Sequence, residues 1–384
     1  MPNRPSFSFY SPAEDRTLVA HGVRQWFARP ESGRFLVGAI PFDKSQPAAL
    51  FEPEEWEFIP GRVDLADSSN PEAIEDDTFT QAQWDSFESR VTEAVNYLRD
   101  NSNPLQKIVL ARLASWTPAE GTFDPAVVHD QLAARNPHAY SYYFGQVPGL
   151  FNINSLFSTP SAEPSTPAAL VGASPELVLR ATPTEEEITF TTMPLAGSLP
   201  QSQAEHMSEA EIKNSLFTEK NLDEHQFVIS DIAAILQSIG AQFTLPETPS
   251  IVATPRVLHL GTRISGTAPG ISMGDFLYKL HPTPAVSGYP QAEAAEFLAR
   301  SKVFDRGLFS GLVGWIDNRQ DSTEGCEFAM TLRGGLVSPS RAVAFAGAGI
   351  VADSNPHEEL LETRAKLATF AAALGCQEPQ PENK

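Results

Sequence analysis

The chain has 384 residues, 41% of them hydrophobic, and its 27 basic and 48 acidic residues give a net charge of −21. So negative a surface repels nucleic-acid phosphates, and no apolar run reaches the ~18 residues of a membrane span. The two cysteines, Cys326 and Cys376, lie far apart, which argues against a disulfide scaffold and a thiolate zinc site. The N-terminus lacks the apolar core of a secretory signal. We expect a cytoplasmic enzyme that binds neither nucleic acid nor membrane.

The first third of the chain predicts strands followed by one helix. Residues 6–60 alternate short apolar runs with turn residues, which is typical of strands, and residues 64–79 form an acidic surface connection. Thr80 and Gln83 have the spacing of a capping box and predict a helix that runs to Leu98. An apolar strand over residues 107–112 follows.

The rest of the chain interleaves strands and helices irregularly. Residues 158–168, rich in Ser, Thr, Pro and Ala, predict a mobile loop. One long helix is expected over residues 208–239, with Gly240 after its end, and a shorter one over 291–301. The expected strands cover residues 170–180, 187–193, 256–267, 311–317, 327–336 and 341–346. Without a regular βα rhythm, the pattern favours an α+β fold with large, mainly antiparallel sheets.

Two charged residues stand at the ends of apolar strands. Lys107 opens its strand, where a lysine usually reaches solvent; buried, it would lose charge to desolvation and become a general base. Glu176 lies between a Gly/Ser/Pro turn and the next strand. It is either a surface carboxylate or a buried acid with a raised pKa. The sequence leaves both pairs of alternatives open.

The C-terminal region places charges beside a small-residue segment. Residues 346–351 predict a turn that exposes backbone, and the helix after it carries Glu359, Glu362 and Lys366 at i, i+3 and i+7 on one face. The pattern allows two interpretations. The three side chains form either a solvated helix face with a Glu362–Lys366 ion pair, or part of a site for a hard metal ion and an anion.

Two further features are ambiguous by themselves. Glu224, on the long helix, is a potential hard-cation ligand or part of a solvated face. Arg333, on an expected strand, binds a carboxylate or is a surface arginine. Gly347 and Gly349 do not complete a dinucleotide fingerprint, because the third glycine is missing.

The order and wording of the motifs resemble the chorismate-utilising enzymes, a family of isochorismate synthases, salicylate synthases, anthranilate synthase large subunits and aminodeoxychorismate synthases. The resemblance covers about residues 105–372. It rests on Lys107-Ile-Val-Leu-Ala-Arg, Gly172-Ala-Ser-Pro-Glu, Pro194-Leu-Ala-Gly-Ser, Glu224-His225, Leu258-His-Leu-Gly-Thr, Leu280-His-Pro-Thr-Pro-Ala-Val-Ser-Gly, Phe304-Asp-Arg-Gly-Leu-Phe-Ser-Gly, Leu332-Arg333 and Ala346-Gly-Ala-Gly-Ile.

This resemblance implies a fold and a site. Two large antiparallel sheets would face each other with helices outside, in one domain over residues 1–376 (1–104 more variable, 105–372 motif-bearing) with a flexible tail, 377–384. Glu224, Glu359 and Glu362 would hold Mg²⁺, with Lys107 and Glu176 as catalytic base and acid. Substrate would contact Gly197, Ser198, His259, Ala285, Phe309, Arg333, Gly347 and Lys366. Relatives usually have Lys-Asp or Lys-Glu where Lys220-Asn221 stands, so this chain departs from the family pattern near the implied metal site.

Within the family, the resemblance is to the isochorismate synthases. Aminodeoxychorismate synthases carry a nucleophilic lysine where Ala196 stands, so water would attack C2 of chorismate here and the C4 hydroxyl would leave. Salicylate synthases, the alternative, typically carry Thr at Ala285 and Tyr at Phe309. We expect a monomeric isomerase without a glutamine amidotransferase subunit, serving siderophore (2,3-dihydroxybenzoate) or menaquinone biosynthesis.

Overall fold

The computed structural model describes residues 4–66, 69–100, 102–145, 168–301 and 304–376. The expected loop over residues 158–168 and the expected tail, 377–384, lie outside this part of the chain, apart from residue 168. No helix in the described ranges is long and apolar enough to cross a membrane.

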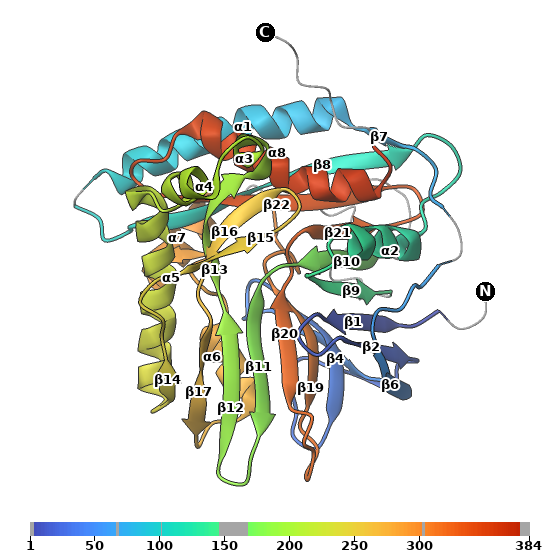
Figure 1. Ribbon diagram of the computed structural model, residues 1–384. Helices are drawn as coiled ribbons and strands as arrows, with labels where there is room; N and C mark the ends of the chain where they lie inside the picture. Colours follow the sequence, from blue (N-terminus) through green and yellow to red (C-terminus); the bar gives the residue numbers. More distant parts are fainter. Residues whose placement is uncertain (1–3, 67–68, 101, 146–167, 302–303, 377–384) are drawn as a thin grey trace.

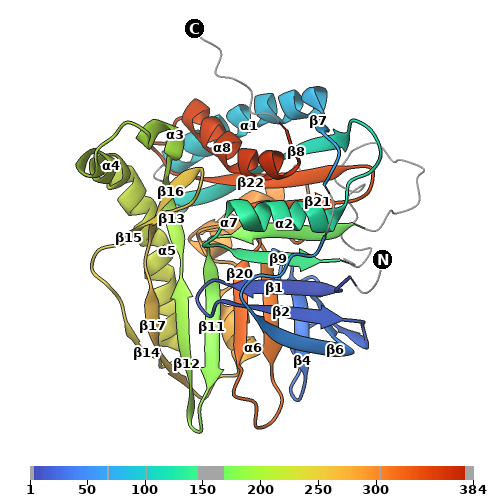
Figure 2. The same ribbon diagram turned by 45° about the vertical axis from the view of Figure 1, so that its right-hand side comes forward.

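Two large sheets form the body of the molecule, and their strands run at a steep angle to each other (Figures 1 and 2). The strand order of the first is β18-β8-β22-β21-β10-β9-β1-β2-β6, with β7 also beside β8, and that of the second is β14-β17-β12-β11-β20-β19-β4-β5-β3. A small third sheet has the order β13-β16-β15. All recorded strand pairs are antiparallel.

The strands have the following bounds. In the first large sheet they are β1 (Phe7–Ser11), β2 (Arg16–His21), β6 (Glu55–Pro60), β7 (Ala73–Glu75), β8 (Lys107–Pro118), β9 (Tyr140–Phe144), β10 (Ala169–Ser174), β18 (Gly288–Tyr289), β21 (Gly334–Val337) and β22 (Ala342–Ile350). In the second they are β3 (Gln25–Phe27), β4 (Phe35–Ile40), β5 (Ala49–Glu52), β11 (Leu177–Pro183), β12 (Glu187–Met193), β14 (Gln242–Thr244), β17 (Ile264–Pro269), β19 (Leu312–Asp317) and β20 (Cys326–Met330). The small sheet has β13 (Leu195–Pro200), β15 (Ser250–Ala253) and β16 (Val257–Gly261).

Helices cover the outer faces of the large sheets. They are α1 (Asp77–Leu98), α2 (Pro125–Arg135), α3 (Gln201–Ala204), α4 (Glu209–Leu216), α5 (Glu219–Ser238), α6 (Met273–Leu280), α7 (Gln291–Arg300) and α8 (Pro356–Ala373). Figure 1 shows α1 and α8 over β8 and β22, and α5 beside the second sheet. The expected α+β fold is therefore confirmed.

The core consists of apolar layers between and outside the two sheets. Between the sheets, strand residues from both, such as Phe9, Phe144, Phe51 and Trp315, bury their side chains against one another. Outside them, α5 and α6 pack on the second sheet, and α2 and α8 pack on the first. Strands of residues 1–104 belong to both large sheets, whereas the expected single domain stays a prediction.

The structure corrects several expected elements. The expected strands over 170–180 and 256–267 are each two strands in different sheets, β10 and β11 in one case and β16 and β17 in the other. Helix α1 begins at Asp77, three residues before the expected cap. The expected helix over 208–239 is two helices, because Thr218 caps a new one by accepting from the Asn221 amide. The expected turn over 346–351 is instead mostly strand: β22 stays paired with β8 up to the Ile350–Ile108 pair.

Candidate active site

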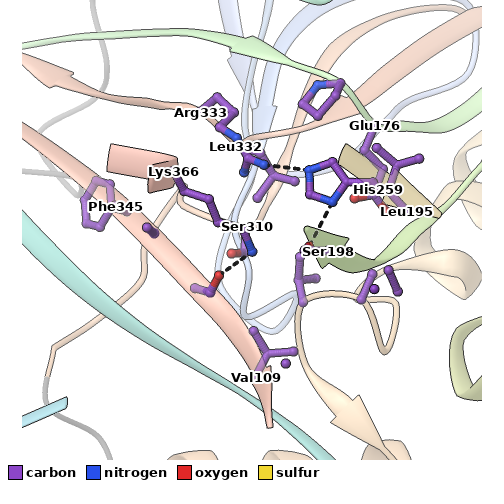
Figure 3. Close-up of a pocket in the computed structure, with 18 of the residues that line it drawn as sticks. Val109, Glu176, Leu195, Ser198, His259, Ser310, Leu332, Arg333, Phe345 and Lys366 are labelled. Atoms are coloured by element: carbon purple, nitrogen blue, oxygen red, sulfur yellow. Dashed lines mark hydrogen bonds between the residues drawn. The ribbon is translucent and has the colours of Figure 1, made fainter. Parts of the chain in front are cut away.

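One cavity gathers most of the predicted site residues from segments that lie far apart in the sequence. It lies where the start of β8, the β10–β11 turn, the small sheet, the break before β21, strand β22 and helix α8 meet. Its wall consists of Val109, Pro175, Glu176, Leu195, Ala196, Gly197, Ser198, Glu224, His259, Ala285, Val286, Phe309, Ser310, Leu332, Arg333, Phe345, Ala346, Gly347, Gly349 and Lys366. Figure 3 shows Arg333, His259, Glu176 and Lys366 around this cavity.

Lys107 is completely buried, so the reading in which it reaches solvent is wrong. Strands β18 and β22 flank it, and its Nζ lies 3.2 Å from Oε1 of Glu224. A Cβ at Gly349 would lie 2.1 Å from that Oε1 and 3.0 Å from Cε of Lys107. The missing side chain of Gly349 thus makes room for this ion pair, even though the segment is a strand and not a turn.

Glu176 is the buried acid of the two alternatives, with 3% of its surface exposed. Burial raises the pKa of its carboxyl to about 8, although the Leu195 amide and the charges of Lys107, Arg333 and Lys366 act in the opposite direction. At neutral pH this carboxyl is therefore protonated and can donate a proton.

A chain of hydrogen bonds connects Arg333, His259 and Ser198 (Figure 3). Nη2 of Arg333 donates to Nε2 of His259 over 2.8 Å, and Nδ1 of His259 lies 3.0 Å from Oγ of Ser198. Burial and the neighbouring charges of Arg333 and Lys366 lower the pKa of His259 well below its usual range, so the ring is neutral. A neutral ring that accepts at Nε2 carries its proton at Nδ1 and donates to Ser198.

Arg333 is not on a strand, contrary to the expectation. It lies between β20 and β21 with a backbone φ of +49°, and its carbonyl accepts from the Ala173 amide. A non-glycine residue in this region is uncommon, and such strain gathers at functional sites. The local kink separates the expected strand over 327–336 into β20 and β21.

The predicted metal ligands are each paired with a lysine. Glu224 pairs with Lys107, while Glu359 lies 2.6 Å from Nζ of Lys220. Lys366 forms the i,i+4 ion pair with Glu362 and also donates to the Gly347 carbonyl. Within the described residues, no three His, Cys, Asp or Glu side chains stand close enough to hold a metal ion as they are.

The charges around Lys220 nevertheless favour a cation at this place. Burial disfavours its ammonium, but Glu359, Glu362 and Glu224 together outweigh burial and raise the pKa of Lys220. Burial and the charge of Glu362 raise the pKa of Glu359 to about 7. Three carboxylates that act on one ammonium are an all-oxygen donor set of the kind Mg²⁺ prefers, so the residues fit this ion.

Asn221 takes no direct part in this cluster. Its side chain is buried and donates to the Leu216 carbonyl over 3.0 Å at the junction of α4 and α5. Its backbone carbonyl would lie 3.0 Å from a Cβ at Gly197, where φ is +78°. The sequence difference at this position thus serves the packing of α5 against β13.

Several wall residues were missed by the sequence prediction. Ser310 has a φ of +58° and Phe345 stacks on Phe309 with ring centroids 4.9 Å apart. Ser310 lies within the family motif that begins at Phe304, and Phe345 directly precedes the one that begins at Ala346. These positions were the sequence signal that could have identified both residues. Lys220 was noted only as a neighbour of Asn221, because its contact with Glu359 joins positions 139 residues apart.

Open space in this cavity amounts to about 60 Å³. Ordinary small-molecule pockets have about 300–1,000 Å³. The site is therefore nearly filled by its own side chains.

The fold and the site together define a class of protein: an α+β enzyme with a buried acid, a buried amine and a cluster of carboxylates around one cavity. A family model described as "Chorismate binding enzyme" matches residues 156–375. A candidate isochorismate synthase, MenF, of Mycobacterium tuberculosis is 33% identical over 97% of both chains. The isochorismate synthase EntC of Escherichia coli is 31% identical over 88% of this chain and 81% of its own length.

A solved structure from Bacillus anthracis agrees with these sequence matches. This structure, of a candidate 2,3-dihydroxybenzoate-specific isochorismate synthase, DhbC, has a TM-score of 0.79 at 28% identity, with 97% of both chains covered. The chain belongs to the family of chorismate-binding enzymes.

Proposed function

We propose that this chain is an isochorismate synthase, an isomerase that converts chorismate to isochorismate. The observation that carries the proposal is the pair Lys107 and Glu176, one amine and one carboxyl, both buried at the same site. An isomerisation that exchanges one hydroxyl position for another needs a base for the entering water and an acid for the leaving hydroxyl.

The proposed reaction uses one group as a base and the other as an acid. Lys107, acting as the base, accepts a proton from water as the water oxygen bonds to C2 of chorismate, and the ring double bonds shift. Glu176 gives its proton to the C4 hydroxyl, which departs as water. Burial favours the protonated form of the Glu176 carboxyl. One water enters and one leaves, so the step is balanced.

Cations of the site account for binding of a dicarboxylate. Arg333 and Lys366 line the cavity, and a substrate carboxylate would take the place of their present partners, His259 and Glu362. Glu224, Glu359 and Glu362 would hold Mg²⁺, which supplies positive charge that fixes and neutralises a carboxylate of the substrate.

The wall also limits which reaction follows. Ala196 is buried, with 6% of its surface exposed, and offers no nucleophile, so water is left as the attacking group. Ala285 and Phe309 add no hydroxyl to the wall, in contrast to the Thr and Tyr of salicylate synthases. Entry of the product into siderophore or menaquinone biosynthesis stays a prediction, as do the monomeric state and the absence of an amidotransferase subunit.

Product analysis tests this function. The purified protein is incubated with chorismate and Mg²⁺, and the products are separated by chromatography. We expect isochorismate without pyruvate from the wild type, and far less of it from the Lys107→Ala variant in the same time. Salicylate with an equal amount of pyruvate would instead identify a salicylate synthase, and unchanged chorismate would overturn the proposal.

A further inference from the structure

A second, larger cleft lies along the edge of β8 that β22 does not occupy. Helices α1 and α7 and residues 304–306 form other walls of it, and its volume is about 670 Å³. That size is within the range of small-molecule sites, and well above the open space of the candidate active site. None of the predicted catalytic or metal-binding residues lines it.

The cleft exists because the edge of β8 is only partly covered. β18 pairs with β8 at Lys107 and Ile108, and β7 pairs with it from Trp116 onward. Between these points the carbonyl oxygens of Val109 and Ala111 accept from arginine side chains instead of a neighbouring strand. Nη2 of Arg306 donates to Val109 over 2.5 Å, and Nη2 of Arg90 donates to Ala111 over 3.0 Å.

These bonds use only part of each guanidinium. Arg306 also donates from Nη1 to the Val286 carbonyl, and Arg90 donates from Nε to the Ser86 carbonyl. Each of these hydrogen-bond acceptors is a neutral carbonyl, whereas a guanidinium has five N–H donors. The Arg306 guanidinium also lies over the Phe42 ring and that of Arg90 over the Phe87 ring, which are likewise uncharged. In the ranges that the structure covers, no carboxylate forms an ion pair with either arginine. In a chain of net charge −21, two such cations side by side are unexpected.

The electrostatics of the two arginines favour an anion beside them. Burial lowers the pKa of Arg306 to about 9, with a further contribution from the charge of Arg90, whose own pKa burial lowers to about 10. Two carboxylates also line the cleft, but they cap turns: Oδ1 of Asp43 accepts from Ser45, and Oδ1 of Asp305 accepts from the Gly307 amide. An anion between the arginines would relieve their repulsion.

We propose that this cleft binds a small apolar carboxylate, with its charged group against Arg90 and Arg306. The planar fork of arginine matches a carboxylate in two parallel hydrogen bonds. Leu110, Leu298 and Phe304 supply an apolar wall for the rest of the ligand. An aromatic or alicyclic acid has this combination of one charge and one apolar ring.

Binding here reaches the candidate active site through Arg306. The two carbonyls that Arg306 holds belong to Val109 and Val286, and both residues line the first cavity. Phe304 also contacts Phe345 of that cavity, with ring centroids 6.0 Å apart. A ligand that draws Arg306 toward the cleft therefore changes the KM for chorismate, by the roughly 5- to 150-fold of usual coupling between sites. This coupling rests on the proposed function, whereas the binding does not.

Calorimetry with benzoate as the probe tests the site, at fixed ionic strength and with benzyl alcohol as the uncharged control. We expect benzoate to bind the wild type and the active-site variant Arg333→Gln alike, and Arg90→Gln at least about tenfold more weakly. Ala295→Trp, which fills the cleft from an exposed helix position, also loses the probe. Thermal unfolding shows which variants are folded.

The outcomes separate the two proposals. Equal benzoate binding by Arg90→Gln and Ala295→Trp, or loss of binding in Arg333→Gln, would place the probe in the active site and overturn the second site. Absence of binding to the wild type would overturn it as well. Binding that follows the expected pattern in a protein that leaves chorismate unchanged would contradict only the proposed reaction.

Discussion

The lysines of one site in this molecule are paired with carboxylates, whereas the arginines of the second cleft are not. In the candidate active site, Lys107, Lys220 and Lys366 each have a glutamate partner, Arg333 donates to the neutral His259 ring, and little open space is left. In the second cleft, Arg90 and Arg306 donate only to neutral carbonyls beside a large open volume. A site built for a charged substrate and a metal can thus be closed on itself, whereas unpaired cations mark a place where the anion has to come from outside.

Of the changes that distinguish the two cavities, removal of the metal should have the largest effect on activity. We expect EDTA to abolish turnover and excess Mg²⁺ to restore it, because without a divalent cation the substrate competes with Glu362 for Lys366. Glu224→Gln should raise the Mg²⁺ concentration for half-maximal activity, whereas Glu219→Gln, an exposed neighbour on α5, should leave it unchanged. Titration of activity with Mg²⁺ measures both. An active protein in EDTA would contradict the metal assignment.

Substitution of the catalytic pair, Lys107 and Glu176, should have the next largest effect on activity. Lys107→Ala and Glu176→Gln should each lower kcat by about 10²–10⁴-fold, the usual contribution of a general base or acid. Lys279→Ala, at an exposed position of α6, is the matched control and should keep full activity. Steady-state kinetics measure the change, and benzoate binding at the second cleft should persist in all three variants. Full activity of a folded Lys107→Ala protein would eliminate the mechanism.

The pH dependence of Glu176 gives the smallest of these effects. Its folded pKa of about 8 lies above the ordinary 4.5, so the stability it contributes is complete below about pH 4.5 and is lost as the pH rises through about 8. Urea unfolding at pH 6 to 9 should therefore show a smaller loss of stability in Glu176→Gln than in the wild type. The kcat/KM of the wild type should fall above about pH 8, because the acid loses its proton. Parallel stability curves would show that this carboxyl is not the one that titrates.

Sequence patterns predicted the fold class and most of the site because each motif carries its chemistry locally. The charged stripe on α8, the lysine that opens β8 and the acid after the β10–β11 turn were all identified by position. Burial decided between their alternatives, and burial depends on which strands flank a residue. Segment 346–351 was misread, since alternating Gly and Ala suit a turn as well as a strand that gives room to a facing ion pair.

The second cleft had no counterpart in the sequence analysis. Arg90 and Arg306 lie on segments more than 200 residues apart, Arg90 on the helix expected to end at Leu98 and Arg306 within the motif that begins at Phe304. Only the gap between β18 and β7 along β8 brings them to the same edge. Such a site follows from what a sheet leaves uncovered, and local patterns do not encode it.

The source of the new hydroxyl tests the proposed mechanism most directly. The enzyme is incubated with chorismate and Mg²⁺ in ¹⁸O-labelled water, and the reaction is stopped at low conversion. The isochorismate is then analysed by mass spectrometry. Attack by solvent water predicts one ¹⁸O atom in the product, located at the C2 hydroxyl. Isochorismate without the label would mean that the C4 hydroxyl itself moves to C2, which would contradict the roles assigned to Lys107 and Glu176.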